Sequence, residues 1–185
     1  MIKLIITDFD GTLVDTFEAN YRAYERAFSA VGLSLTRERY RECFGFRFDR
    51  FMATMGIVDT QISSRIKELK SEYYPQFFEH LQVNGALLGF IRMFRAGGGK
   101  TAVASTARRR NLENALKHIG ALNDFDLILA GEDVTNGKPS PEIYNTVISR
   151  LGATPGETLI FEDSPVGLQA AHSADANVIQ IQTTN

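Results

Sequence analysis

Short apolar runs alternate with amphipathic stretches over the second part of the chain, from Asn84 onward. The runs are rich in aliphatic and β-branched side chains and are bounded by turn residues, which is typical of buried strands. With the apolar run Leu4-Ile5-Ile6 near the amino terminus, they predict strands at 4–6, 100–104, 127–130, 158–161 and 177–181.

Helices are predicted between these strands. The segment 109–119 has helical periodicity and is ended by Gly120. Ser140-Pro141 and Ser164-Pro165 each predict a helix start, with serine as N-cap and proline in the first turn, and Gly152 ends the first of these helices. Strands separated by helices require right-handed crossovers, so we expect an α/β fold with a parallel sheet covered on both faces.

Residues 16–82 have a different pattern, with helical stretches at 17–31, 37–44 and 61–78 and no convincing strand. An all-helical insertion directly after the first strand is expected to act as a lid over the carboxyl end of that strand. We therefore predict a core domain formed by 1–15 and 83–185 and a helical cap domain formed by 16–82.

Composition narrows the class of protein. The chain has 185 residues, of which 44% are hydrophobic and 23% charged, and a net charge of -2 leaves no broad basic surface for nucleic acid or anionic lipid. The amino terminus meets a charge too early for a signal peptide, and no apolar stretch approaches the roughly 18 residues of a membrane span. Cys43 is alone, which excludes a disulfide framework. We expect a cytoplasmic monomer or weak homo-oligomer without nucleic-acid or membrane partners.

Two carboxylates follow the first strand, in Asp8-Phe9-Asp10-Gly11. Because the backbone curls at Gly11, both carboxylates can converge beyond the carboxyl edge of the sheet, where ligands bind in open α/β folds. Such a pair can divide nucleophile and acid/base roles and can hold a hard cation through oxygen. The same residues also fit a solvated Asp-Gly turn that closes a strand.

Four further polar residues lie at or just past predicted strand ends: Ser105, Lys138, Glu162 and Asp163. Each has a structural alternative, since Ser105 fits a helix cap, Lys138 a solvated loop cation, and the acidic pair the start of a helix. Their shared position at one edge of one sheet favours a common site.

These motifs resemble those of the haloacid dehalogenase superfamily, in its branch with a helical cap, and the resemblance runs from Lys3 to about Ile181. Asp8-Phe9-Asp10-Gly11-Thr12-Leu13-Val14-Asp15 resembles the first motif, Ser105 the second, Lys138 the third and Glu162-Asp163 the fourth. The passages at 137–141 and 161–167 are most similar to the sugar-phosphate phosphatases and β-phosphoglucomutase-like members. The resemblance implies a Rossmann-like core of three layers.

The resemblance also implies a chemistry. Asp8 would attack phosphorus and form an aspartyl-phosphate, and Asp10 would protonate the leaving oxygen and later activate water. Ser105 and Lys138 would hold the phosphoryl oxygens. Four residues are implied to hold Mg²⁺: Asp8, Asp10 through its carbonyl oxygen, Asp163, and Glu162 directly or through water.

Substrate contacts are expected from residues near the second motif and in the cap: Ser105, Thr106, Arg108, Asn20 and Arg47. Arg47 and Arg50 are expected in a cap loop. The basic run 108–110 at a helix start opposes the helix dipole, which indicates either an anion contact or a solvated turn.

The resemblance implies a Mg²⁺-dependent phosphatase of a small phosphorylated metabolite, such as a sugar phosphate or related phosphomonoester. The dehalogenase- and phosphonatase-type members of the resembling family generally lack an aspartate at the position of Asp10, so its presence favours phosphoryl transfer. A phosphosugar mutase is the first alternative, although Asn20 and Tyr24 occupy the positions where the resembling mutases have histidine and tryptophan. A non-catalytic phosphate-binding or regulatory protein is the second.

Overall fold

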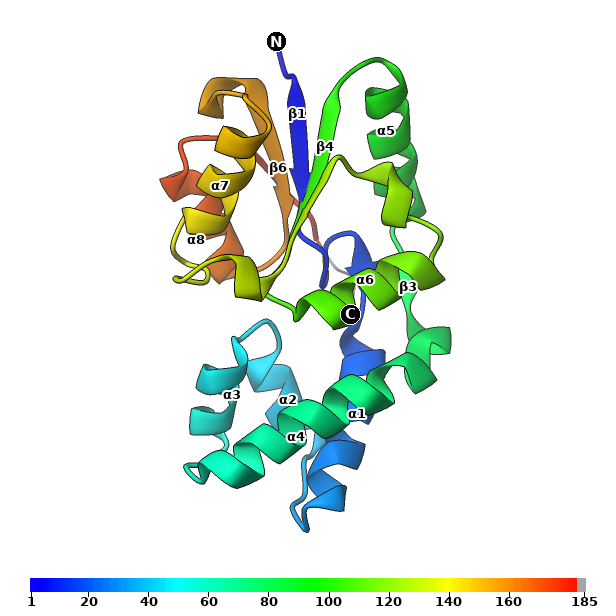
Figure 1. Cartoon of the computed structure of the whole chain (residues 1–185), viewed down its shortest axis with the longest axis vertical. Helices are drawn as coiled ribbons and strands as arrows, with labels where there is room; N and C mark the ends of the chain where they lie inside the picture. Colours follow the sequence, from blue (N-terminus) through cyan, green and yellow to red (C-terminus); the bar gives the residue numbers. More distant parts are fainter. Residues whose placement is uncertain (183–185) are drawn as a thin grey trace. The chain divides into compact units, whose positions relative to one another are not determined.

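The computed structural model describes residues 1–182 of the chain and contains a parallel sheet with the strand order β5-β4-β1-β6-β7 (Figure 1). The strands are β1 Leu4–Thr7, β4 Lys100–Ala104, β5 Leu127–Leu129, β6 Thr158–Glu162 and β7 Asn177–Gln180. Neighbouring strands pair in parallel throughout, so the predicted α/β fold and its parallel sheet are confirmed.

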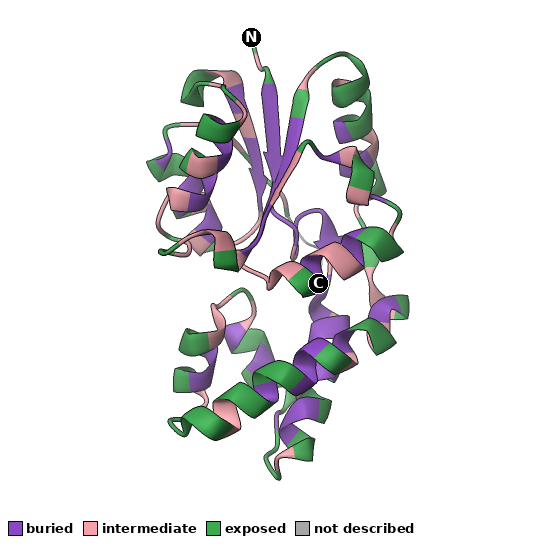
Figure 2. Cartoon of the chain, viewed as in Figure 1, coloured by how far each residue is buried: buried purple, intermediate pink, exposed green. Residues whose placement is uncertain are grey.

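Helices cover both faces of this sheet. The helices α7 Glu142–Arg150 and α8 Pro165–Ser173 lie on one face, and α5 Gly85–Ala96 and α6 Arg109–His118 lie on the other (Figure 1). Side chains alternate along β1, so Leu4 and Ile6 pack into the cluster formed with α7 and α8. Ile5 is equally buried, and Figure 2 shows β1 buried along its length. A strand buried on both faces explains why the apolar runs were recognisable in the sequence.

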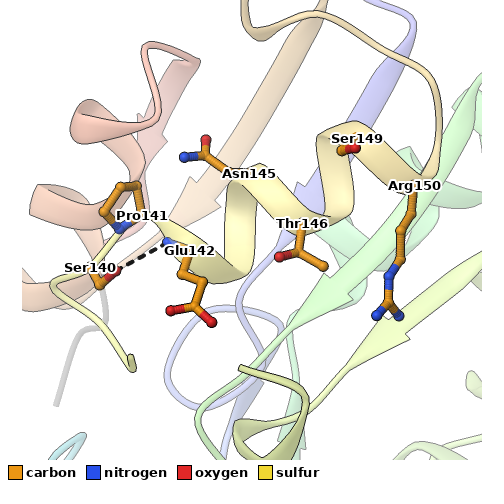
Figure 3. Close-up of a pocket in the computed structure, with 7 residues that line it drawn as sticks. All are labelled: Ser140, Pro141, Glu142, Asn145, Thr146, Ser149 and Arg150. Carbon is orange, nitrogen blue, oxygen red and sulfur yellow. Dashed lines mark hydrogen bonds between the residues drawn. The ribbon is translucent and has the colours of Figure 1, made fainter. Parts of the chain in front are cut away.

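The start of α7 differs slightly from the prediction. Pro141, rather than Ser140, takes the N-cap position, and the helix begins at Glu142. The Glu142 backbone N–H donates to Ser140 Oγ at 3.3 Å (Figure 3). The Glu142 carboxylate in turn accepts hydrogen bonds from the backbone N–H groups of Thr135 and Asn136 at 2.7 and 2.9 Å, which fixes the preceding loop to the first helical turn.

The chain divides into two compact units, one formed by Met1–Asp15 with the chain from Gln82 onward, and one by Thr16–Leu81. Gln82 was predicted to belong to the helical insertion. In the structure it pairs with Asp15, because the short strands β2 Val14–Asp15 and β3 Gln82–Val83 form an antiparallel ribbon.

The second unit contains α1 Phe17–Ala30, α2 Arg37–Cys43, α3 Phe48–Thr54, α4 Thr60–Tyr73 and the 3-10 helix η1 Tyr74–His80. The predicted loop around Arg47 and Arg50 is wrong for Arg50, which lies inside α3. The predicted helix at 61–78 changes to η1 at Tyr74, since Pro75 has no N–H to continue the α-helical ladder. No helix within residues 1–182 is long and apolar enough to span a membrane.

Candidate active site

Three adjacent strands bring polar residues to one edge of the sheet. Asp8 directly follows β1, Ser105 directly follows β4, and Glu162 ends β6. Because β1 pairs with β4 on one side and with β6 on the other, these residues lie at the same carboxyl edge. The structure thus brings together the polar residues expected at the strand ends.

Lys138 connects these strand ends. Its Nζ donates to Asp8 Oδ1 at 2.6 Å, to Glu162 Oε1 at 2.5 Å and to the Ala104 carbonyl oxygen at 3.3 Å. The Lys138 side chain is only 3% exposed, so it is not the solvated loop cation that the sequence also allowed. It forms a buried ion pair with the proposed nucleophile.

Asp10 faces a different partner. Ser105 Oγ donates to Asp10 Oδ2 at 3.2 Å and accepts the Ala107 backbone N–H at 3.0 Å. The loop that follows Asp10 is closed by the Gly11 N–H, which donates to the Val14 carbonyl oxygen at 2.8 Å. The two carboxylates of the first motif therefore contact different groups, with Asp8 on the lysine and Asp10 on the serine.

Asp163 lies against this same loop. Thr12 Oγ1 donates to Asp163 Oδ1 at 2.7 Å. Gly11 has φ +93°, and a Cβ built on it would lie 2.2 Å from Asp163 Oδ2, so both the backbone conformation and the space require glycine. Thr12 was quoted as part of the motif, but its contact with Asp163 joins residues far apart in sequence and could not be predicted from local pattern.

Glu162 is fully buried and surrounded by donors. Its Oε1 accepts from Lys138 and from the Tyr144 hydroxyl, the latter at 2.9 Å. Its Oε2 accepts from the backbone N–H groups of Asp163 and Ser164 at 2.9 and 3.0 Å and from Ser164 Oγ at 3.1 Å. Tyr144 was not predicted as a site residue, because an aromatic residue at helical spacing next to aliphatic neighbours resembles an ordinary core residue.

The electrostatics of the site are dominated by carboxylates. Burial raises the pKa of Asp8 well above its usual value, and the neighbouring acids Glu162, Asp163 and Asp10 add to this while Lys138 opposes it. Burial also raises the pKa of Asp163 to about 6. Burial alone would raise the pKa of Glu162, but Lys138 and the hydrogen bonds that Glu162 accepts lower it. When ionised, the four acids Asp8, Asp10, Glu162 and Asp163 would carry more negative charge than Lys138 alone can balance.

The donor set fits a hard divalent cation. Asp8 and Asp163 could supply carboxylate oxygens, and Asp10 could supply the backbone carbonyl oxygen that the family resemblance implies. Within residues 1–182, no three acidic, histidine or cysteine side chains are arranged to hold a metal by themselves. Two carboxylates and a carbonyl suit Mg²⁺, which is usually bound by one or two carboxylates and retains several waters.

The remaining residues expected at the site have varied surroundings. Thr106 follows Ser105 and is partly exposed. Arg108 precedes α6, and its Nε lies 3.6 Å from Glu132 Oε1. Arg109 pairs with Glu113 and Asp133, so this member of the basic run has a structural role and is not part of a solvated turn.

Asn20 and Arg47 belong to the helical unit. Asn20 is buried, and its Nδ2 donates to Thr16 Oγ1 at 3.0 Å. Arg47 precedes α3, with Nε 3.8 Å from Asp49 Oδ1. Lys70, which was not predicted as a notable residue, is buried in this unit with its Nζ 3.9 Å from the centre of the Tyr74 ring. The roles of Asn20 and Arg47 in substrate binding stay predictions.

A surface hollow on α7 is lined by Ser140, Pro141, Glu142, Asn145, Thr146, Ser149 and Arg150 (Figure 3). It contains none of the residues at the strand ends. The polar cluster around Lys138, rather than this hollow, is the candidate active site.

Comparisons with known proteins agree with this site. The family model described as haloacid dehalogenase-like hydrolase matches residues 5–181. A phosphorylated carbohydrates phosphatase from Thermotoga maritima is 30% identical, covering 94% of this chain and 82% of the relative. A validoxylamine A 7'-phosphate phosphatase from Streptomyces hygroscopicus subsp. limoneus is 31% identical, covering 100% and 88%.

Among solved structures, CbbY from Rhodobacter sphaeroides in complex with phosphate has a TM-score of 0.87 and 29% identity, covering 96% of this chain and 85% of that one. The resemblance inferred from the motifs is therefore confirmed over nearly the whole chain. This chain belongs to the haloacid dehalogenase-like hydrolase family and is a phosphatase of that family.

Proposed function

We propose that the protein hydrolyses a small phosphorylated metabolite of the sugar-phosphate class, with Mg²⁺ as cofactor and an aspartyl-phosphate as intermediate. The contact between Lys138 Nζ and Asp8 Oδ1 at 2.6 Å is the main support for this proposal. An ammonium group beside a buried carboxylate offsets its repulsion from an anionic substrate, which a nucleophile attacking phosphate requires.

Asp8 and Asp10 divide the chemistry. An Asp8 carboxylate oxygen attacks phosphorus, the bond from phosphorus to the ester oxygen breaks, and Asp10 gives its proton to the departing alcohol. Asp10 then takes a proton from water as the water oxygen attacks the phosphoryl group, which releases inorganic phosphate and restores Asp8. Ser105, which already contacts Asp10, and Lys138 donate hydrogen bonds to the phosphoryl oxygens.

Asp8, Asp163 and the Asp10 carbonyl oxygen would hold Mg²⁺. A bound Mg²⁺ would supply positive charge that neutralises the phosphoryl oxygens as negative charge develops on them. Glu162 accepts hydrogen bonds on both oxygens from protein donors, so we propose that it reaches the metal only through water. Its direct role is to hold Lys138.

Two relatives support the proposed substrate class. One is named for phosphorylated carbohydrates, and CbbY has also been solved in complex with xylulose 1,5-bisphosphate. We propose that Thr106 and Arg108, together with Asn20 and Arg47 of the helical unit, contact the remainder of the substrate.

Turnover of a panel of phosphorylated metabolites and of para-nitrophenyl phosphate, with Mg²⁺ or with EDTA, tests this function. We expect phosphate release that requires Mg²⁺ and is faster for phosphosugars than for other esters. The matched control is Asp8→Asn, which keeps the side-chain shape and should release no phosphate. Metal-independent release, or release by Asp8→Asn at more than a small fraction of the wild-type rate, would contradict the proposal.

A further inference from the structure

Tyr144 of α7 contacts Glu162 with its hydroxyl and Lys138 with its aromatic ring. Its hydroxyl donates to Glu162 Oε1 at 2.9 Å, and the centre of its ring lies 4.9 Å from Lys138 Nζ. The residue is completely buried. The rest of the helix face that it shares is aliphatic and includes Ile143 and Val147, so packing alone would be satisfied by phenylalanine.

The hydrogen bonds of Lys138 show why a tyrosine hydroxyl is useful there. An ammonium has three N–H donors, and the acceptors around Nζ are Asp8 Oδ1, Glu162 Oε1 and the Ala104 carbonyl oxygen. If Lys138 is to donate to a phosphoryl oxygen, it must break its hydrogen bond to one of these three acceptors. Release of Glu162 would leave a buried carboxylate oxygen without a donor, which is unfavourable, unless another donor is present.

We propose that Tyr144 is a positioning residue for Lys138: its ring holds the ammonium beside Asp8, and its hydroxyl remains on Glu162 Oε1 when Lys138 turns toward the phosphoryl group. This inference rests on the proposed function, in which Lys138 binds the transferred group. It assigns a role to a residue that does not itself touch the substrate.

The test is Tyr144→Phe, which removes the hydroxyl and keeps the ring. Without the hydroxyl, Glu162 retains Lys138 more strongly, so we expect kcat/KM to fall about tenfold and the inhibition constant of inorganic phosphate to rise about threefold, changes in the range of one lost hydrogen bond. The Mg²⁺ concentration for half activity should not change. Ile148→Val is the control, because it trims a buried side chain of the same helix that has no part in the ion pair.

A double-mutant cycle separates positioning from general stability. If Tyr144 acts through Lys138, adding Tyr144→Phe to Lys138→Ala should change the residual activity less than about twofold, since contacting residues are not additive. Equal losses in both backgrounds would overturn the inference. Tyr144→Met, which also removes the ring, is the second variant should Tyr144→Phe not fold, and its loss should be larger.

The outcomes distinguish this inference from the proposed function. A wild-type protein that hydrolyses phosphosugars while Tyr144→Phe matches it in kcat/KM and in phosphate inhibition would overturn the inference alone. A wild-type protein without turnover would overturn the proposed function, and the inference would then be decided by calorimetric titration with inorganic phosphate. If Tyr144→Phe bound inorganic phosphate as tightly as the wild type in that titration, the inference would be overturned as well.

Discussion

At the scale of single residues, two acids that are neighbours in sequence have different surroundings. Glu162 is fully buried and accepts hydrogen bonds from Lys138, from Tyr144 and from backbone N–H groups. Asp163 instead accepts a hydrogen bond from Thr12 and lies against the loop that carries Asp8. These contacts support the proposed division, in which Glu162 holds the lysine and Asp163 binds the cation.

This division can be measured by metal titration of two variants. Asp163→Asn should raise the Mg²⁺ concentration needed for half activity about tenfold or more, because a ligand charge is lost; the loss of metal-site partners commonly costs 10–100-fold in affinity. Lys138→Ala should lower activity even at saturating Mg²⁺, because the ammonium beside Asp8 is gone. Identical titration curves for the two variants would show that the two roles are not separate.

The pKa of Asp163 gives a pH dependence for the metal-free protein. Burial raises its pKa from 3.8 to about 6, so between these values the folded state binds more protons than the unfolded state. The contribution of Asp163 to the free energy of unfolding therefore falls as pH rises from about 4 to about 6. In EDTA, urea unfolding should show Asp163→Asn gaining stability relative to wild type as pH rises through this window. A stability difference that is constant with pH would contradict the prediction.

At the scale of helices and strands, the strands of the parallel sheet were predictable and the two-residue strands were not. The predicted ranges for all strands of that sheet agree with the observed strands to within one residue at each end, because short runs rich in aliphatic residues and bounded by turn residues are typical of strands. The ribbon of β2 and β3 was missed, since each strand has two residues and depends on a partner far along the chain. The contacts of Tyr144 and Thr12 were missed for the same reason.

Glycine substitutions test how the first loop is built. Gly11→Ala should lower the free energy of unfolding by more than about 1 kcal/mol, because alanine is unfavourable at φ +93° and its Cβ would collide with Asp163. Gly89→Ala in α5 is the control, since a Cβ there has no atom within 4 Å. It should stabilise by about 0.5–1 kcal/mol, because alanine favours helix. The test is thermal unfolding, and a shift of Tm in the same direction for both variants would contradict this account.

At the scale of the whole molecule, the strand order explains why so much of the site could be predicted. β1 lies at the centre of the sheet between β4 and β6, so residues that follow three separate runs in the sequence meet at one edge. The sequence alone could place each residue at a strand end. It could not show that Lys138 would contact both Asp8 and Glu162, because these contacts depend on side-chain packing between residues 130 and 24 positions apart in the sequence.

The balance between hydrolysis and phosphoryl transfer to a sugar is also a property of the whole protein. Asn20 is an amide and cannot take up a proton near neutral pH, so it cannot act as the cap histidine of the resembling mutases. With β-glucose 1-phosphate and a catalytic amount of glucose 1,6-bisphosphate, any turnover should release inorganic phosphate. Rapid formation of glucose 6-phosphate with almost no free phosphate would establish a mutase instead.

The central claim is that Asp8 carries the phosphoryl group during turnover. The most direct measurement is acid quenching of the enzyme during steady-state hydrolysis, followed by mass spectrometry of its peptides. We expect one phosphoryl group on the peptide containing Asp8, located at Asp8 by fragmentation, and none in Asp8→Asn treated in the same way. Turnover with no labelled peptide under conditions that preserve acyl phosphates, or with the label on another residue, would contradict the account.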